Sequence, residues 1–258
     1  MSTKPAATEK PKIKNLLISQ AKPADANNPY QPLAEKYKLK LDFRPFIEIQ
    51  PVGYKEFRKQ KINILDFTAI IFTSRNAVDG FFAICKEAKI EMPPEMKYFC
   101  VSEQTANYLQ KYIVIRKRKI FVGAKSATDL NEYFLKHKTE KYLFPSSDIR
   151  QPHVADFLTK HGIQFKEAVI YNTVSADLSG MDPKAFDIIT FFSPSGVDSL
   201  KKQFPEIEQG DIRMAAFGPT TAQAVRDAGY RLDIEAPMPN APSMAGAIEL
   251  YLKSQTGK

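Results

Sequence analysis

Long apolar runs are missing from this sequence of 258 residues. No stretch approaches the length of about eighteen uncharged apolar residues that a membrane-spanning helix needs, so a membrane span is not expected. Residues 1–14, MSTKPAATEKPKIK, contain no apolar core, which argues against a secretory signal. The sequence therefore predicts a cytoplasmic protein with no membrane partner.

Cysteine and histidine are scarce. Cys85 and Cys100 are the only cysteines and form no CxxC pair, so neither a disulfide framework nor a cysteine-based zinc site is expected. The histidines His137, His153 and His161 have no carboxylate or cysteine partner at the spacing of metal ligands. We therefore expect no metal.

Common catalytic and nucleotide-binding motifs are also missing. The sequence contains no GxGxxG, no GxxxxGK[ST] and no GxSxG, so it signals neither a dinucleotide, nor a phosphate loop, nor a serine hydrolase. Acidic pairs occur, but none lies in a motif typical of an acid–base couple. Any activity is therefore expected to use hydroxyl groups, backbone amides and shape.

Basic residues outnumber acidic ones by 37 to 29, which gives a formal net charge of +8. Residues 47–171 carry 20 basic and 14 acidic side chains, a difference of +6, so most of the excess lies in the middle of the chain. Such an excess indicates an anionic partner, namely nucleic acid, phosphates or a polycarboxylate, or it serves only solubility. Composition alone leaves both interpretations open.

Short β-rich runs alternate with helical stretches, which is typical of parallel α/β proteins. Each run is followed within a few residues by Ser, Thr, Pro or Gly and then by a helical stretch. Such junctions place hydroxyls and free backbone N–H groups at the carboxyl edge of a sheet, where α/β proteins bind ligands. The expected strands are 15–19, 68–73, 97–101, 142–144, 187–192 and 213–217.

Four segments recur in a consistent order, which indicates an internal repeat. The fourth segment of the first copy finds its counterpart at the N-terminus, so the repeat has a circular offset. The matched segments are 70–79 with 189–198, 98–109 with 214–225, 120–135 with 234–252, and 141–171 with 15–49.

The offset predicts two α/β domains of similar topology, each built on a parallel sheet. One domain is discontinuous, 1–42 plus 176–258, and the other is the contiguous segment 53–165. The linking segments 43–52 and 166–175 are β-rich and run in opposite senses, so they are expected to pair as a two-stranded antiparallel ladder. We expect a cleft between the domains that closes around a substrate.

The strand–helix junctions supply the candidate binding residues. A serine at such a junction is often only a helix N-cap, but several junctions opening toward one cleft favour ligand binding. Segment 144–150 is expected to form a loop with two hydroxyls and the cation Arg150. Gly196 is expected to tighten its turn, where a side chain would either block close approach of a ligand or strain a positive-φ turn. The candidates are Ser74, Arg75, Thr105, Ser146, Ser147, Ser193, Ser195, Gly196, Thr220 and Thr221.

The motifs FTSRNAV, FPSSDIR, AVIYNTV, FDIITFFSPSGVDSL and AAFGPTTAQAV together resemble the uroporphyrinogen-III synthase family, from about residue 66 onward. Ser102 is a departure, because relatives commonly carry Gly there. The resemblance implies two α/β domains joined by a β-ladder and a lyase that uses no cofactor. It implies a substrate, hydroxymethylbilane, which is a linear tetrapyrrole bearing acetate and propionate groups. The enzyme removes its terminal hydroxyl, inverts ring D through a spiro intermediate and closes the macrocycle.

The resemblance also gives Tyr171 a role. A strand tyrosine is usually a packing residue, but Tyr171 matches the tyrosine of the family's VY-x-T segment and is the candidate to hydrogen-bond or protonate the departing hydroxyl. We expect a monomer that binds this small polycarboxylate and no nucleic acid. Two alternatives stay open: a non-catalytic tetrapyrrole- or polyanion-binding module with the same fold, and a nucleic-acid-binding protein, which would show a steep salt dependence.

Overall fold

The structure is a computed structural model, and it describes residues 13–23, 28–114, 117–123, 127–149 and 152–256. The amino-terminal segment behind the localisation prediction lies largely outside the described residues, as does Arg150. The strands are β1 (Asn15–Ile18), β2 (Lys40–Phe43), β3 (Ile47–Pro51), β4 (Ala69–Phe72), β5 (Lys97–Cys100), β6 (Ile120–Val122), β7 (Tyr142–Ser147), β8 (Phe165–Ser175), β9 (Ile188–Phe191), β10 (Arg213–Phe217) and β11 (Leu232–Ala236).

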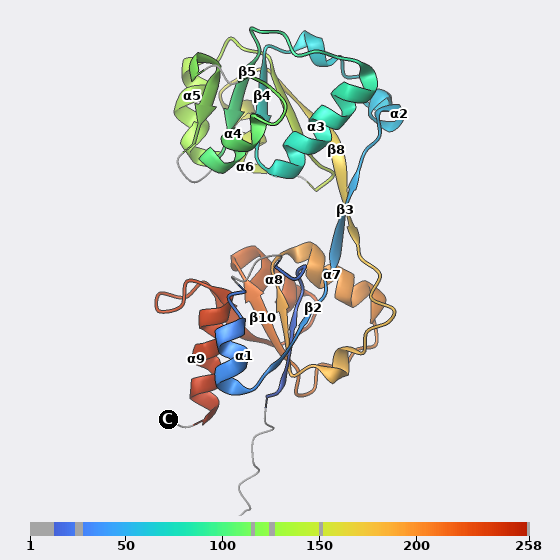
Figure 1. Cartoon of the computed structure of the whole chain (residues 1–258), viewed down its shortest axis with the longest axis vertical. Helices are drawn as coiled ribbons and strands as arrows, with labels where there is room; N and C mark the ends of the chain where they lie inside the picture. The colour runs from blue at the N-terminus through green and yellow to red at the C-terminus, as the bar shows by residue number, and fades with distance from the viewer. Residues whose placement is uncertain (1–12, 24–27, 115–116, 124–126, 150–151, 257–258) are drawn as a thin grey trace, which may run out of the picture. The chain divides into compact units, whose positions relative to one another are not determined.

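Helices follow most of the strands along the chain (Figure 1). Every strand expected from the sequence is present, and the α/β fold with parallel sheets is confirmed. The helices are α1 (Gln31–Tyr37), α2 (Tyr54–Phe57), α3 (Arg75–Ala88), α4 (Glu103–Leu109), α5 (Asn131–Lys136), α6 (Pro152–Lys160), α7 (Pro194–Gln203), α8 (Pro219–Asp227) and α9 (Met244–Thr256). No helix in the described part of the chain is long and apolar enough to cross a membrane.

The chain divides into two compact units. Unit 1 comprises Met1–Glu48 and Val174–Lys258, and unit 2 comprises Ile49–Thr173. The chain passes from one unit to the other at 48–49 and returns at 173–174. Both passages lie within the segments 43–52 and 166–175.

Unit 1 contains a parallel five-stranded sheet in the order β11-β10-β9-β1-β2. Alternate residues of a strand point to opposite faces of the sheet. Leu16 and Ile18 of β1 accordingly pack in one buried cluster with residues of α1 and α9. Leu17 packs in another cluster with residues of α7 and α8. The sheet is therefore covered by helices on both faces, which is typical of parallel sheets.

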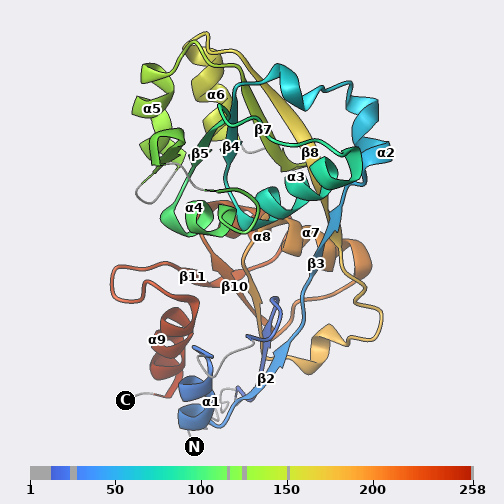
Figure 2. The same cartoon turned by 45° about the horizontal axis from the view of Figure 1, so that its top comes forward.

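Unit 2 contains a six-stranded sheet in the order β3-β8-β7-β4-β5-β6. The five strands from β8 to β6 are parallel. Buried residues of α3 and α4 pack on one face of this sheet, and those of α5 and α6 pack on the other. Figure 2 shows β8 running beside β7 within the unit.

The two sheets share one strand order. The repeats match β6 with β11, β5 with β10, β4 with β9 and β7 with β1, and in that correspondence the order β6-β5-β4-β7-β8 repeats the order β11-β10-β9-β1-β2. The helices correspond in the same way, because α3 and α4 cover one face of their sheet as α7 and α8 do in unit 1. The circular offset read from the sequence therefore describes the topology.

The two linking strands do not form a ladder separate from the sheets, because both belong to the sheet of unit 2. β8 pairs in parallel with β7 from Phe165 to Tyr171, so its first part belongs to the sheet of unit 2. β3 runs antiparallel beside β8: the Val52 N–H donates to the Ile170 carbonyl at 2.9 Å, and the Ala176 N–H donates to the Phe46 carbonyl at 3.0 Å. Residues 166–171 therefore do two things, since they complete one sheet and carry the chain toward unit 1.

Candidate functional site

The carboxyl edge of each sheet collects the candidate residues of its own unit. In unit 2, Ser74 and Arg75 follow β4, Thr105 lies in α4 after β5, and Ser147 and Tyr171 lie at the ends of the paired parts of β7 and β8. In a parallel sheet these ends all meet at one edge, where helix N-termini also present free N–H groups.

Unit 1 has the equivalent edge. Ser193, Ser195 and Gly196 lie at the start of α7 after β9, and Thr220 and Thr221 lie at the start of α8 after β10. The structure thus brings each set together at one edge of one sheet. α7 and α8 both begin with proline, which has no N–H and fits the first helical position.

Two matching serines cap the two matching helices. The Ser74 hydroxyl oxygen accepts from the Ala77 N–H at 3.1 Å, and the Ser193 hydroxyl oxygen accepts from the Gly196 N–H at 3.2 Å. A hydroxyl that accepts in this way keeps its own proton free to donate. Both serines are half-buried. They therefore cap their helices and can still donate to a carboxylate.

Gly196 corrects an expectation. It lies inside the first turn of α7 and has no positive φ, because the positive-φ glycines of the described chain are Gly162, Gly210, Gly218 and Gly229. A Cβ at Gly196 would approach the Ser193 hydroxyl oxygen at 3.6 Å, an ordinary contact. The tight turn lies instead at Gly218, the N-cap of α8, with φ of 88°. Because α7 begins at Pro194, Gly196 is the third residue of the helix and does not lie in the turn before it.

The two matched threonines point into their units. Thr105 is 4% exposed and Thr221 is 2% exposed. The Thr105 hydroxyl lies 3.1 Å from that of Ser102, which caps α4 by accepting from the Thr105 N–H. Thr220, one residue before Thr221, is exposed. At this junction Thr220 is therefore the hydroxyl that can meet a ligand directly.

Ser146 and Ser147 lie in a strand, not in the expected loop. Pairing with β8 extends β7 through both serines, beyond the point at which Pro145 indicates a turn. Both are buried. The Ser146 hydroxyl donates to the Ser147 carbonyl at 3.3 Å, and the Ser147 hydroxyl donates to the Ile149 carbonyl at 3.0 Å. Pairing with a distant strand has overridden the local turn signal of Pro145. The two serine hydroxyls bond the backbone at the end of β7 and are buried there.

Tyr171 pairs with Ser147 in the sheet and is 7% exposed. Its ring packs in the same buried cluster as the inner residues of α3. No residue of the described chain forms a hydrogen bond with the Tyr171 hydroxyl, and its oxygen is not fully buried. The ring therefore has a packing role, and the hydroxyl keeps its hydrogen-bonding capacity.

Sequence reasoning missed a polar cluster beside Arg75. The Arg75 guanidinium carbon lies 5.5 Å from the centre of the Tyr108 ring. The Tyr108 hydroxyl donates to both carboxylate oxygens of Asp79 at 2.9 Å. Tyr112 also donates to Asp79, and the Lys111 ammonium lies 3.5 Å from that carboxylate. One signal was available, since Asp79 matches Asp198 in the other repeat.

The cluster keeps Asp79 ionised. Burial alone raises the pKa of the Asp79 carboxyl, but the hydrogen bonds from Tyr112 and Tyr108 and the charge of Lys111 outweigh it, so the pKa is lower than usual. Thr73 directly follows β4 and precedes the candidates Ser74 and Arg75. Its buried hydroxyl oxygen has no hydrogen-bond partner among the described residues.

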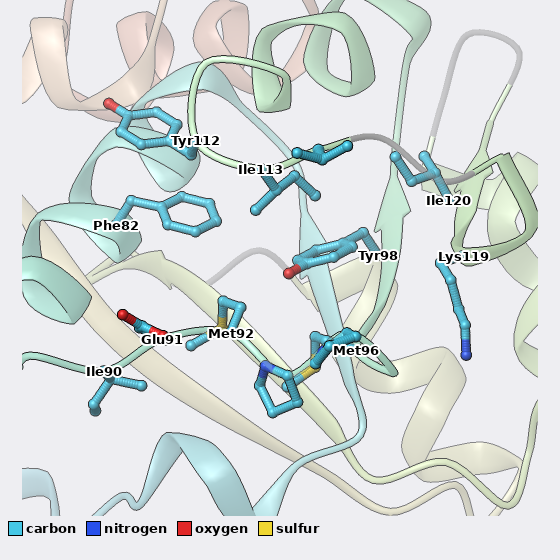
Figure 3. A pocket seen from close by; sticks show the side chains of 13 residues that line it. Phe82, Ile90, Glu91, Met92, Met96, Tyr98, Tyr112, Ile113, Lys119 and Ile120 are labelled. Atoms are coloured by element: carbon cyan, nitrogen blue, oxygen red, sulfur yellow. The ribbon is translucent and has the colours of Figure 1, made fainter.

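A separate cavity of about 420 Å³ lies in unit 2 (Figure 3). Its wall includes Phe82, Met92, Met96, Tyr98 and Ile113. These residues come from α3, from the start of β5 and from the segments that precede β5 and β6, so the cavity opens near the amino ends of those strands. It contains none of the candidate residues and is not part of the carboxyl edge.

The described residues include no group of three or more His, Cys, Asp or Glu side chains that could hold a metal ion. Cys85 and Cys100 are free and buried. Burial raises the pKa of each thiol to about 12, which makes both poor nucleophiles. The chemistry available at the two edges is therefore that of hydroxyls, helix amides, Arg75 and Tyr171.

Two relatives resemble this chain, one over nearly its full length and one over less than half of it. A uroporphyrinogen-III synthase from Chlorobaculum parvum is 25% identical over 257 residues, which cover 93% of this chain and 100% of that protein. The Saccharomyces cerevisiae uroporphyrinogen-III synthase is 28% identical over 123 residues, 42% of this chain and 45% of that protein.

Solved structures share the fold. The uroporphyrinogen-III synthetase of Helicobacter pylori matches with a TM-score of 0.60 at 20% identity, over 94% of this chain and 100% of that one. A mutant uroporphyrinogen III synthase of Thermus thermophilus matches with a TM-score of 0.58 at 15% identity, over 93% and 99%. The family model described as uroporphyrinogen-III synthase HemD matches residues 28–246. That match includes both sheet edges, and this chain belongs to the uroporphyrinogen-III synthase family.

Proposed function

We propose that this chain is a cyclising hydro-lyase that converts hydroxymethylbilane into uroporphyrinogen III and water. The observation that carries the proposal is the family match over residues 28–246, which includes all candidate residues of both units. The carboxyl edges that bear these residues support it, because they offer the groups that a polycarboxylate needs.

Substrate binding is the first task. The bilane carries acetate and propionate groups along its length, so many weak donors suit it better than one strong site. Ser74, Ser193 and Ser195 are half-buried at helix N-termini, and Arg75 and Thr220 are exposed beside them. Helix N-termini and hydroxyls stabilise carboxylates, and the basic excess of residues 47–171 attracts the anion.

Departure of the hydroxyl is the chemical step. The C–O bond breaks, the oxygen takes a proton and leaves as water, and the electron-rich pyrrole spreads the resulting positive charge. Tyr171 is the group proposed to assist, because its hydroxyl has no partner in the described chain while its ring is held by packing. A hydrogen bond from the phenol to the leaving oxygen stabilises the charge that develops there.

Isomer choice is the third task. The free bilane closes to the uninverted isomer, so the protein must bring the substituted carbon of ring D to the terminal methylene. Correct positioning of reacting groups can contribute roughly 7–11 kcal/mol at the extreme. We propose that the helix starts at the carboxyl edges bind the carboxylates of the substrate, and that a monomer suffices without nucleic acid.

A coupled assay tests the proposal. Hydroxymethylbilane is generated in situ, the protein is added, and the porphyrins are oxidised and separated into I and III isomers. The enzyme is expected to give mainly the III isomer, at a yield that rises with protein concentration. A non-catalytic binding module would bind the bilane and leave only the I isomer, and that result would overturn the proposal.

A further inference from the structure

The pairing of β7 with β8 contains a bulge next to Tyr171. Ser146 pairs with Val169, and the next residue of β7, Ser147, pairs with Tyr171. Ile170 is therefore an extra residue on β8, since it lies between the partners of two consecutive residues of β7. Bulges of this kind bend a strand and redirect the side chains that follow.

The bulge decides which face of the sheet receives Tyr171. Consecutive residues of a regular strand point to opposite faces, yet Ile170 and Tyr171 both pack in the cluster that contains the inner residues of α3. Leu143, which shares the odd-numbered face of β7 with Ser147, lies in the same cluster. Without the extra residue, Ser147 would pair with Ile170 and Tyr171 would point to the opposite face.

The backbone N–H and carbonyl of Val169, next to the bulge, are bonded by a side chain and not by β3. β3 bonds to β8 at Ile170, through the Val52 N–H. Val169 is bonded instead by the side chain of Gln60, which lies just before the segment that leads into β4. The Gln60 amide nitrogen donates to the Val169 carbonyl at 2.7 Å, and the Val169 N–H donates to the Gln60 amide oxygen at 2.9 Å.

Helix α3 packs closely against the extra residue, Ile170, at Gly80. A Cβ at Gly80 would come within 3.1 Å of the Ile170 Cδ1 and 3.3 Å of the Ile170 carbonyl oxygen. The absence of a side chain at Gly80 thus lets the helix approach the bulge closely. The bulge is packed by α3 and bonded by Gln60.

We propose that Gln60 is a positioning residue for Tyr171: it fixes the bulge at Val169 and Ile170 and thereby holds the Tyr171 hydroxyl at the carboxyl edge of unit 2. The proposal rests on the function proposed above for Tyr171. This role requires an amide at position 60, because the side chain must donate to the Val169 carbonyl and accept from the Val169 N–H at the same time. A carboxylate can only accept, and leucine can do neither.

Gln203 provides a matched control in unit 1. Its amide nitrogen donates to the Ala176 carbonyl at 2.5 Å, and its amide oxygen accepts from the Leu178 N–H at 2.8 Å. Gln203 therefore donates to one backbone group and accepts from another just beyond the end of β8, much as Gln60 does at Val169 within the strand. Neither the bulge nor Tyr171 lies there, so its loss is expected to affect stability without affecting Tyr171.

The experiment compares Gln60→Leu, Gln60→Glu and Gln203→Leu in the full chain. Turnover by both Gln60 variants should fall roughly ten- to hundredfold, as expected when a reacting group is misplaced, with little change in KM. Gln203→Leu should keep the wild-type turnover. Gln60→Glu serves if the leucine variant fails to fold, since it keeps the size of the side chain and the acceptor but replaces the donor with a negatively charged oxygen that faces the Val169 carbonyl.

A structural readout separates this proposal from the proposed function. The tyrosine ring-carbon NMR signal of Tyr171, assigned with Tyr171→Phe, should shift or broaden in the Gln60 variants and stay in place in Gln203→Leu. A shifted signal together with unchanged turnover in Tyr171→Phe would keep Gln60 as the residue that fixes the ring and overturn the catalytic role of Tyr171. An unmoved signal would overturn the proposal for Gln60. Where Tyr171→Phe lowers turnover, equal turnover in the Gln60 and Gln203 variants would overturn it too.

Discussion

The guanidinium of Arg75 lies over the ring of Tyr108, 5.5 Å from its centre, at the carboxyl edge of unit 2. The Tyr108 hydroxyl is bonded to Asp79, which lies one helical turn after Arg75 on α3. The hydrogen bonds to Asp79 therefore fix the hydroxyl end of the Tyr108 ring, and the face of the ring contacts the Arg75 guanidinium. This arrangement presents Arg75 to a carboxylate in a restricted set of conformations.

Replacing Tyr108 tests whether that restriction aids binding. Tyr108→Leu removes the ring and is expected to raise KM for the bilane about two- to fivefold, which corresponds to the ~0.5–1 kcal/mol of an exposed cation–π contact. Tyr108→Phe keeps the ring and should raise KM less. Steady-state kinetics in the coupled assay measures both. Equal KM values for wild type and Tyr108→Leu would show that Arg75 needs no such support.

The stability of unit 2 should depend on pH through Asp79. Because the pKa of Asp79 is lower in the folded chain, its ionised form stabilises the fold above the unfolded-state pKa of about 3.9. That stabilisation is lost as the pH falls through the folded-state value. Urea unfolding between about pH 6 and 3 should therefore show a smaller acid-induced loss in Asp79→Asn than in wild type.

A control for Asp79 is available in the other repeat. Asp198 matches Asp79 in the sequence repeat but is exposed, and Asp198→Asn should unfold with the pH dependence of wild type. If Asp79→Asn also follows wild type, the two tyrosine hydrogen bonds to Asp79 contribute nothing to stability.

Two helical glycines should respond differently to alanine. Gly80→Ala would force a Cβ to within 3.1 Å of the Ile170 side chain, so overpacking of about 1–3 kcal/mol should exceed the gain in helix propensity. Gly196→Ala meets only ordinary contacts and should be neutral or stabilising. Urea denaturation compares the two free energies of unfolding. A Gly80→Ala protein as stable as Gly196→Ala would mean that α3 can move away from the bulge at no cost.

Carboxylate recognition should be distributed over the helix starts. Ser193→Ala removes the cap of α7 and should cost about 1 kcal/mol of stability, whereas Ser195→Ala removes a hydroxyl that caps nothing in the described chain and should leave stability unchanged. Each should raise KM by only a few fold. Abolished turnover in either variant, with folding and binding intact, would instead make that serine the catalyst.

The sequence predicted elements whose signals are local or repeated. The β-rich runs around Ile71 and Ile189 were correctly predicted to be strands, and the repeats match the shared strand order of the two sheets. The junction serines Ser74 and Ser193 were found because a hydroxyl between a strand and a helix is a local pattern. Such patterns do not depend on what packs against them.

Other features depend on contacts between distant segments and could not be read in this way. Ser146 and Ser147 lie in a strand because β8 pairs with them, which overrides the turn signal of Pro145. The position of Gly196 depends on where α7 begins after the strand. Gln60 is joined to Val169 across 109 residues, and no local pattern marks either residue.

The central claim is that the phenol of Tyr171 assists departure of the substrate hydroxyl, and Tyr171→Phe tests it most directly. The change deletes one oxygen and keeps the ring that packs against α3. Initial rates and isomer ratios in the coupled assay should show turnover reduced by roughly 10²–10⁴, the range of a positioned proton donor, with the III isomer still formed. Turnover equal to wild type would contradict the claim, and a product shifted to the I isomer would assign Tyr171 to the positioning of ring D instead.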